Sequence, residues 1–193
     1  MLGMRRQTIL LLASILCGLC FTCEAGAGRD KAYTRTIENY EVPDVSLINQ
    51  DGVKVGLRKL LLSDRPVLVD FIYTTCTTIC PVLSINFVNF QKTITREPGK
   101  VTLVSISIDP EFDTPKAMKA YLNRYRAQAG WDFLTGSRED ISRVLKAFNA
   151  FTLNKMNHYP VILLKSPSDR HWVRVYGLIG TSELLVEYEK VRQ

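Results

Sequence analysis

The chain has 193 residues, of which 46% are hydrophobic and 23% are charged. This length and apolar content suffice for one well-buried domain and are short for two. The formal net charge is +6, but the basic residues are scattered, with no basic run and no interleaved row of aromatic residues. The charge pattern therefore indicates a solvated surface and argues against nucleic-acid binding.

The N-terminal segment has the pattern of a secretory signal. Arg5 and Arg6 precede an apolar run from Ile9 to Phe21, and the small residues 25–27 follow it. The run is shorter than the roughly 20 residues that a membrane-spanning helix needs. A cleaved signal is therefore favoured, and an uncleaved N-terminal membrane tether is the alternative.

We divide the chain into residues 1–25, a signal peptide or N-terminal anchor, residues 26–40, a polar lead-in, and residues 41–193, the folded domain. Three of the five cysteines lie in the first segment, which leaves only Cys76 and Cys80 in the domain. The expected location is the periplasm or the outer face of the inner membrane. There the two thiols face an oxidising compartment together.

The domain alternates predicted strands and helices. Strands are expected at 42–48, 66–73, 101–108, 131–134, 161–165 and 171–176, and helices at 57–62, 80–96, 114–129, 137–148 and 181–191. The polar residues 49–52 indicate a hairpin turn near the N-terminus of the domain. This order predicts an α/β fold whose mixed central sheet has helices on both faces.

Cys76 and Cys80 lie at the junction between the predicted buried strand 66–73 and the predicted helix 80–96. Ligands of open α/β sheets bind at the carboxyl ends of strands, so a site is expected here. If the first turn of the helix includes both cysteines, their sulfurs share one face, and the spacing also permits a disulfide. The helix N-terminus is expected to lower the pKa of one of the two thiols toward the thiolate, the form that attacks disulfides and binds metals.

A purely structural disulfide is the alternative interpretation of this pair. It would close a loop of about five residues and stabilise the domain by only about 2 kcal/mol on the chain-entropy model. A redox-active or metal-binding dithiol is therefore favoured.

A third ligand must come from elsewhere, and the chain has two histidines. His158 lies in the polar loop 154–160, just before a predicted strand, and is expected near the cysteine junction. His171 lies among basic residues and is interpreted as a surface imidazole. Two thiolates and one imidazole form a soft, low-coordinate set that suits Cu(I), although zinc uses the same donors.

Other polar and sulfur-containing side chains are weaker candidates for a role in the site. Met156 could offer a thioether, but packing is the favoured interpretation. Asp70 lies inside an apolar strand and Asp109 ends another, and each either orients the site or is a satisfied structural carboxylate. Asp113 and Thr114 are predicted to cap the helix that follows them.

Three features together resemble the Sco/SenC family. They are residues 74–81 (TTCTTICP), residues 105–110 (SISIDP) followed by 113–115 (DTP), and a histidine before the late hairpin. The resemblance covers the chain from about residue 40 onward. The combination is specific, whereas a bare C-x3-C motif is weak.

The resemblance implies a thioredoxin-like fold with an N-terminal β-hairpin elaboration, and copper bound by Cys76, Cys80 and His158. It implies a metallochaperone that helps to assemble the dinuclear copper centre of cytochrome c oxidase. The implied partners are the copper-accepting subunit of that oxidase, or a similar exported cuproprotein, and a thioredoxin-like reductant. The family is also credited with thiol–disulfide reduction, for which Cys76 and Cys80 would be the catalytic, redox-active dithiol.

The sequence departs from the family pattern near these residues. Thr77 and Thr78 stand where a proline and an acidic residue are common, and Tyr73 stands where glycine is common. Tyr159-Pro160 is similar instead to the cis-proline of thioredoxins, which lies against the active cysteines. All three implied ligands are nevertheless present.

Two classes of function follow from these residues. A copper metallochaperone needs Cys76, Cys80 and His158, whereas a thiol–disulfide oxidoreductase needs the two thiols but not the histidine. A peroxidase of the peroxiredoxin type is a weaker third interpretation, because Thr77-x-x-Cys80 is similar to a peroxidatic motif but the expected upstream proline is absent. Enzyme activity as a thiol–disulfide reductase is the alternative, secondary to copper delivery.

Overall fold

The computed structural model describes residues 33–94 and 101–192. The expected signal segment 1–25 and the start of the expected lead-in, residues 26–32, lie outside the described residues. Within the described ranges, no helix is long and apolar enough to cross a membrane.

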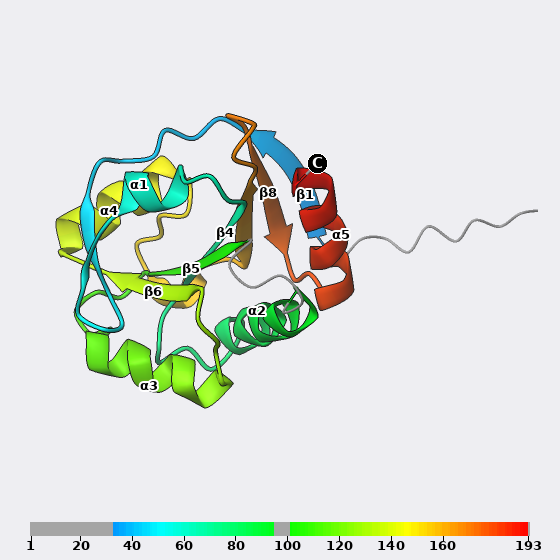
Figure 1. Cartoon of the computed structure of the whole chain (residues 1–193). Helices are drawn as coiled ribbons and strands as arrows, with labels where there is room; N and C mark the ends of the chain where they lie inside the picture. Colours follow the sequence, from blue (N-terminus) through cyan, green and yellow to red (C-terminus); the bar gives the residue numbers. More distant parts are fainter. Residues whose placement is uncertain (1–32, 95–100, 193) are drawn as a thin grey trace, which may run out of the picture. The chain divides into compact units, whose positions relative to one another are not determined.

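In the described part of the chain, eight strands form one mixed sheet in the order β1-β8-β7-β4-β5-β6-β2-β3 (Figure 1). In chain order the strands are β1 (Tyr33–Glu38), β2 (Ser46–Asn49), β3 (Lys54–Gly56), β4 (Val67–Ile72), β5 (Thr102–Ser107), β6 (Trp131–Thr135), β7 (Val161–Lys165) and β8 (Trp172–Gly177). β5 runs parallel to its neighbours β4 and β6, and the other neighbouring pairs are antiparallel. β4 therefore lies inside the sheet, as the sequence predicts.

Helices cover both faces of this sheet. They are α1 (Leu57–Leu61), α2 (Cys80–Ile94), α3 (Pro115–Tyr125), α4 (Arg138–Ala147) and α5 (Thr181–Arg192), with a short 3-10 turn, η1 (Lys155–Asn157). The apolar residues of α2, α3 and α5 pack in one core cluster, and those of α1 and α4 pack in a second. The two clusters lie on opposite sides of the sheet (Figure 1).

β4 is the strand that both clusters share. All six of its residues are buried. Leu68 and Ile72 belong to the cluster of α2, α3 and α5, whereas Val69 and Phe71 belong to the cluster of α1 and α4. Because both faces are covered, the strand sequence is apolar at every position except Asp70, rather than alternating. The chain leaves this strand into the loop that holds Cys76.

The N-terminal hairpin elaboration is confirmed, with shifted boundaries. β2 begins at Ser46, after Pro43, and pairs with both β3 and β6. Gly52 supplies the positive φ of 77° that the turn needs, and its N–H donates to the Asn49 carbonyl at 2.9 Å.

Residues 33–38 differ from the expected polar lead-in, because they form β1 and pair antiparallel with β8. Tyr33 is the one buried residue of β1. Its hydroxyl donates to the buried Glu187 carboxylate of α5 at 3.0 Å, and Arg35 donates to the same carboxylate at 2.8 Å. Polar residues thus hold this edge strand, so its sequence lacks the apolar signal of a strand.

Candidate metal centre

Cys76, Cys80 and His158 meet at the carboxyl end of β4. Their ligand atoms all lie within 4.8 Å of one another. Cys76 lies in the loop after β4, Cys80 is the first residue of α2, and His158 directly follows η1. The helix begins at Cys80, as the sequence predicts, so Cys76 lies outside it and the two cysteines do not share a helical face. Both cysteines are free thiols and buried, and His158 is half-buried.

The backbone of η1 orients the His158 ring. Nδ1 lies 2.7 Å from the Lys155 carbonyl oxygen, which can only accept, so Nδ1 carries the proton. Nε2 then presents a lone pair, and it lies 3.3 Å from Cys80 Sγ. Burial lowers the pKa of His158, although the bond to Lys155 partly opposes this. A neutral imidazole held through its other nitrogen is the form that ligates metals.

The pKa values of the two thiols shift in opposite directions, down for Cys76 and up for Cys80. Burial raises the pKa of Cys76, but hydrogen bonds from the Cys80 thiol and from the N–H groups of Cys80 and Thr78 outweigh it, so the pKa falls to about 7. Burial raises the pKa of Cys80, and the neighbouring Cys76 raises it further. The expected thiolate is therefore Cys76. It lies outside the helix, but its sulfur accepts hydrogen bonds from the N–H groups of Thr78, just before α2, and of Cys80, the first residue of α2.

Asp113 holds the cysteine loop in place. Its carboxylate accepts hydrogen bonds from the Thr74 N–H at 3.0 Å, from the Thr74 hydroxyl at 2.5 Å and from the Ser107 hydroxyl at 2.6 Å. The predicted capping role is thus wrong for Asp113 and confirmed for Thr114, whose hydroxyl accepts from the Ala117 N–H at 3.2 Å. Asp113 joins residues that are distant in the sequence, so local sequence reasoning missed it.

Tyr73 fills the space beside His158. Its ring packs edge-on against the imidazole, with the centroids 5.2 Å apart. Its hydroxyl donates to Met156 Sδ at 3.3 Å. Burial and the two nearby thiols raise the pKa of Tyr73 to about 12, so the phenol keeps its proton. The residue that departs from the family pattern is therefore a packing support for the histidine.

Of the two acidic residues considered as orienting groups, Asp109 has a direct link to the site. Its carboxylate accepts from Lys155 Nζ at 2.5 Å, and the Lys155 carbonyl holds His158. Asp70 is fully buried, and neither carboxylate oxygen has a hydrogen-bond partner of ordinary length. Burial raises the pKa of Asp70 to about 7, an effect that the nearby Ser105 hydroxyl and the Asp70 backbone amide reduce.

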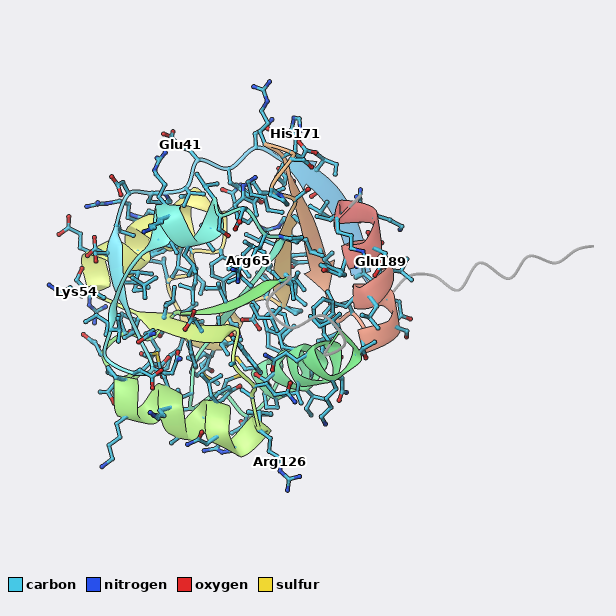
Figure 2. The ribbon with its side chains drawn as sticks, in the orientation of Figure 1. Glu41, Lys54, Arg65, Arg126, His171 and Glu189 are labelled. Atoms are coloured by element: carbon cyan, nitrogen blue, oxygen red, sulfur yellow. The ribbon has the colours of Figure 1, made fainter. Side chains whose placement is uncertain are left out.

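His171 lies away from the thiols, as expected for a surface imidazole. It precedes β8 at the end of the hairpin where Trp172 pairs with Lys165, whereas His158 precedes the opposite end of β7. Its Nδ1 lies 2.7 Å from an Asp169 carboxylate oxygen. Figure 2 shows the side chain at the outer surface.

The likeness of Tyr159-Pro160 to the cis-proline of thioredoxins is not borne out. No peptide bond among the described residues is cis, and this bond is therefore trans. Tyr159 instead points its ring at Tyr176 of β8, with the centroids 5.5 Å apart.

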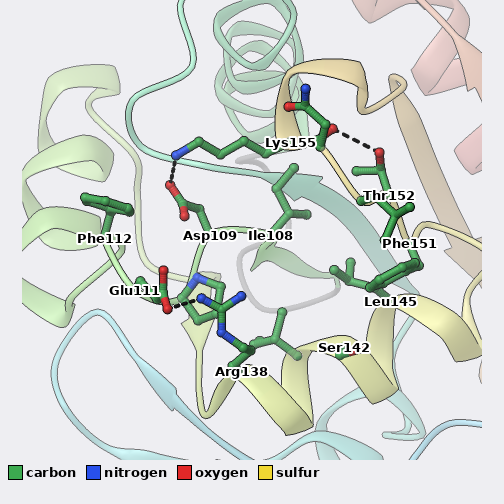
Figure 3. A pocket seen from close by; sticks show the side chains of 14 residues that line it. Ile108, Asp109, Glu111, Phe112, Arg138, Ser142, Leu145, Phe151, Thr152 and Lys155 are labelled. Atoms are coloured by element: carbon green, nitrogen blue, oxygen red, sulfur yellow. Dashed lines mark hydrogen bonds and ion pairs between the residues drawn. The ribbon is translucent and has the colours of Figure 1, made fainter.

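A hollow of about 650 Å³ lies beside the site, between α4 and the loops that carry Asp109 and Lys155 (Figure 3). The three metal-ligand candidates do not line it. Its charged side chains are paired, Lys155 with Asp109 and Arg138 with Glu111. Because these charges neutralise one another, the hollow offers no unpaired charge to a small ionic ligand.

The fold and this geometry define a thioredoxin-like domain with a Cys-x3-Cys pair and a histidine at the end of a central strand. The family model for SCO1/SenC matches residues 35–175. The chain belongs to the SCO1/SenC family.

Individual relatives agree with this assignment. The SCO1 protein homolog of Bacillus subtilis is 41% identical over 115 residues, which cover 58% of this chain and 58% of that protein. The next two curated relatives are matched over about half of their length. The structure of BsSco, described as a cytochrome c oxidase assembly protein with a disulfide switch, has a TM-score of 0.66 and 31% identity, covering 81% of this chain and 96% of that one. Copper-bound ScoI of Arabidopsis thaliana has a TM-score of 0.62 and 27% identity, covering 77% and 98%.

Proposed function

We propose that this protein binds one copper(I) ion through Cys76, Cys80 and His158 and delivers it to another exported protein. The observation that carries the proposal is the convergence of two sulfurs and one imidazole nitrogen within 4.8 Å. The His158 Nε2 lone pair is already turned toward Cys80, so binding requires no change of tautomer.

The donor set fits copper(I) better than zinc. Structural zinc is almost always held by four protein ligands, and catalytic zinc by three ligands and a water. Within the described residues, this group supplies three donors, and both cysteines are buried. Copper(I) is soft and is satisfied by such a low-coordinate set of thiolates and imidazole. The copper-bound relative supports this choice.

The proposed acceptor is the copper-accepting subunit of cytochrome c oxidase, or a similar exported cuproprotein. The name of the BsSco structure, which refers to assembly of that oxidase, supports this proposal. The signal-like segment 1–25 supports export to the periplasm or to the outer face of the inner membrane. We propose residues 1–25 as the signal peptide or N-terminal anchor and, because β1 pairs within the same sheet, a copper-binding domain that includes β1 as well as residues 41–193.

Anaerobic titration of the reduced protein with Cu(I), in competition with bicinchoninate, tests the proposal. The wild type is expected to bind one equivalent. His158→Ala should lower the affinity by more than about tenfold, because removing a ligand exceeds the effect of removing a group that only orients one. His171→Ala is the matched control and should bind as the wild type does. Equal affinity in all three proteins would remove His158 from the site.

A second candidate function is thiol–disulfide exchange by the same cysteines. The observation that favours it is the split in acidity, since a thiol with a pKa of about 7 is poised to attack at neutral pH and its buried neighbour to resolve the mixed disulfide. Reduction of a disulfide substrate by the metal-free protein tests it. Turnover that survives His158→Ala, in a wild type that binds no copper tightly, would favour the oxidoreductase over the metallochaperone.

A further inference from the structure

Met156 is an exposed sulfur beside the candidate metal centre. The side chain is 65% exposed, although it belongs to η1, the turn that carries His158. An apolar side chain contributes to folding by leaving water, and an exposed methionine forgoes most of that contribution. Core packing, the favoured interpretation from the sequence, therefore does not account for this residue.

The Met156 thioether is nevertheless held in a defined place. The Asn154 side chain accepts a hydrogen bond from the Met156 N–H at 2.9 Å, which fixes the turn. The Tyr73 hydroxyl donates to Met156 Sδ at 3.3 Å, and the ring of the same Tyr73 packs against His158. One buried tyrosine thus contacts both the exposed sulfur and the imidazole ligand, and the second lone pair of the sulfur stays available.

We propose that Met156 is an exchange ligand for copper(I), which takes the place of His158 while the metal enters or leaves. This inference rests on the proposed function. A thioether is a soft donor that suits copper(I), and it is neutral at every pH, as the His158 imidazole is when it ligates. In the exchange one Cu–S(thioether) bond forms as the Cu–Nε2 bond breaks. Copper stays in the +1 state and no proton is transferred.

Met156 lies on the solvent side of the candidate metal centre, so the exchange would move copper between the buried thiolates and the surface. Cys80 is fully buried, Cys76 is 6% exposed and His158 is half-buried, whereas Met156 is largely in solvent. A ligand on the outer side of the site brings the metal within reach of a partner's donors before the thiolates release it. Leucine at this position would keep the size and apolarity of the side chain but remove the donor.

Equilibrium affinities test the pairing of Met156 with His158. In anaerobic Cu(I) competition with bicinchoninate, Met156→Leu should leave the affinity of the otherwise wild-type protein unchanged, because His158 is the resting ligand. In the His158→Ala background the same substitution should lower the affinity further by about tenfold, a coupling of about 1.4 kcal/mol. A lowered affinity of the single Met156→Leu variant would make the thioether a permanent ligand and contradict the exchange role.

Release kinetics test the exchange itself. Transfer of copper to excess bicinchoninate, followed by stopped-flow absorbance, should slow by about tenfold in Met156→Leu. Met118→Leu is the matched control, because it removes a fully buried thioether of α3. Wild-type release rates in Met156→Leu, with no effect in the His158→Ala background, would overturn the inference and leave the proposed function standing. If the wild type bound no copper, the proposed function would fail and this inference with it.

Discussion

At the residue scale, the difference in acidity between the two thiols is open to direct measurement. In the reduced, metal-free protein, iodoacetamide should label Cys76 first, and the rate should rise with pH to a midpoint near 7, because its pKa lies at about 7. Cys80 should react slowly over this range, because burial and the Cys76 charge raise its pKa. Peptide mapping by mass spectrometry identifies the labelled residue.

Thr78 provides the variant for this measurement. Its hydroxyl lies 3.6 Å from Cys76 Sγ and helps to lower the pKa of that thiol. Thr78→Val should therefore shift the labelling midpoint upward, whereas Thr77→Val, the neighbouring exposed position, should leave it in place. Labelling of Cys80 ahead of Cys76 would contradict the assignment of the thiolate.

The raised pKa of the buried Asp70 carboxyl should make the stability of the protein depend on pH. Its pKa of about 7 in the folded state exceeds the ordinary 3.8, so the folded state binds more protons between these values. The unfolding free energy of the metal-free protein should therefore fall from about pH 4 to about pH 7, by up to about 4 kcal/mol for this group. Asp70→Asn should remove this part of the slope in urea unfolding, and Asp64→Asn, at an exposed carboxylate, should not. Equal slopes in all three proteins would contradict the prediction.

At the scale of elements, the sequence predicts the interior of the sheet and misses its edge. β4 and β5 are buried on both faces, so their apolar runs are visible in the chain itself. β1 is exposed except at the buried Tyr33 and the half-buried Glu38, and it is held by pairing with β8 and by polar contacts to α5. Such contacts join residues far apart in the sequence, and no local pattern marks them.

The same reasoning applies to the candidate site. Cys76, Cys80 and His158 could be named from the sequence because their chemistry is rare in this chain, which has two cysteines after the signal-like segment and two histidines. The supporting roles of Tyr73 and Asp113 depend on which side chains meet after folding. The start of α2 at Cys80 agrees with the helix predicted from residue 80.

The contacts of Glu187 allow a prediction of how strongly β1 is held against α5. This buried carboxylate on α5 accepts from the Tyr33 hydroxyl and from Arg35 and Lys190. Glu187→Ala removes this shared acceptor and, because the two cations are partly exposed, should lower the unfolding free energy by about 1–3 kcal/mol in urea denaturation. Faster hydrogen exchange in β1 should accompany the loss.

Glu189, two residues along the same helix, is the control for Glu187. It makes an exposed pair with Arg192 at 2.7 Å. Glu189→Ala should change the unfolding free energy by no more than about 0.5 kcal/mol, as is usual for exposed pairs one helical turn apart. A similar loss of unfolding free energy in both variants would mean that Glu187 has no special role in holding β1.

At the scale of the whole molecule, the dithiol permits two states that exclude each other. The proposed copper site uses the sulfurs of both Cys76 and Cys80, whereas a disulfide joins those sulfurs and passes two electrons to the oxidant, with loss of two protons. The sulfurs lie within 4.8 Å of each other, so a disulfide bond of about 2.05 Å needs a small movement of the Cys76 loop. Because Cys76 lies outside the helix, this movement leaves the hydrogen bonds of α2 in place.

The metal should therefore protect the thiols, and the disulfide should block the metal. Glutathione disulfide is expected to oxidise the metal-free protein to the intramolecular disulfide, with release of two glutathione molecules, and to oxidise the copper-loaded protein much more slowly. Thiol titration and mass spectrometry follow both reactions. His158→Ala should still form the disulfide but lose the protection by copper, because the thiols remain and the third ligand does not. Oxidation of the loaded wild type at the metal-free rate would mean that copper is held away from the dithiol.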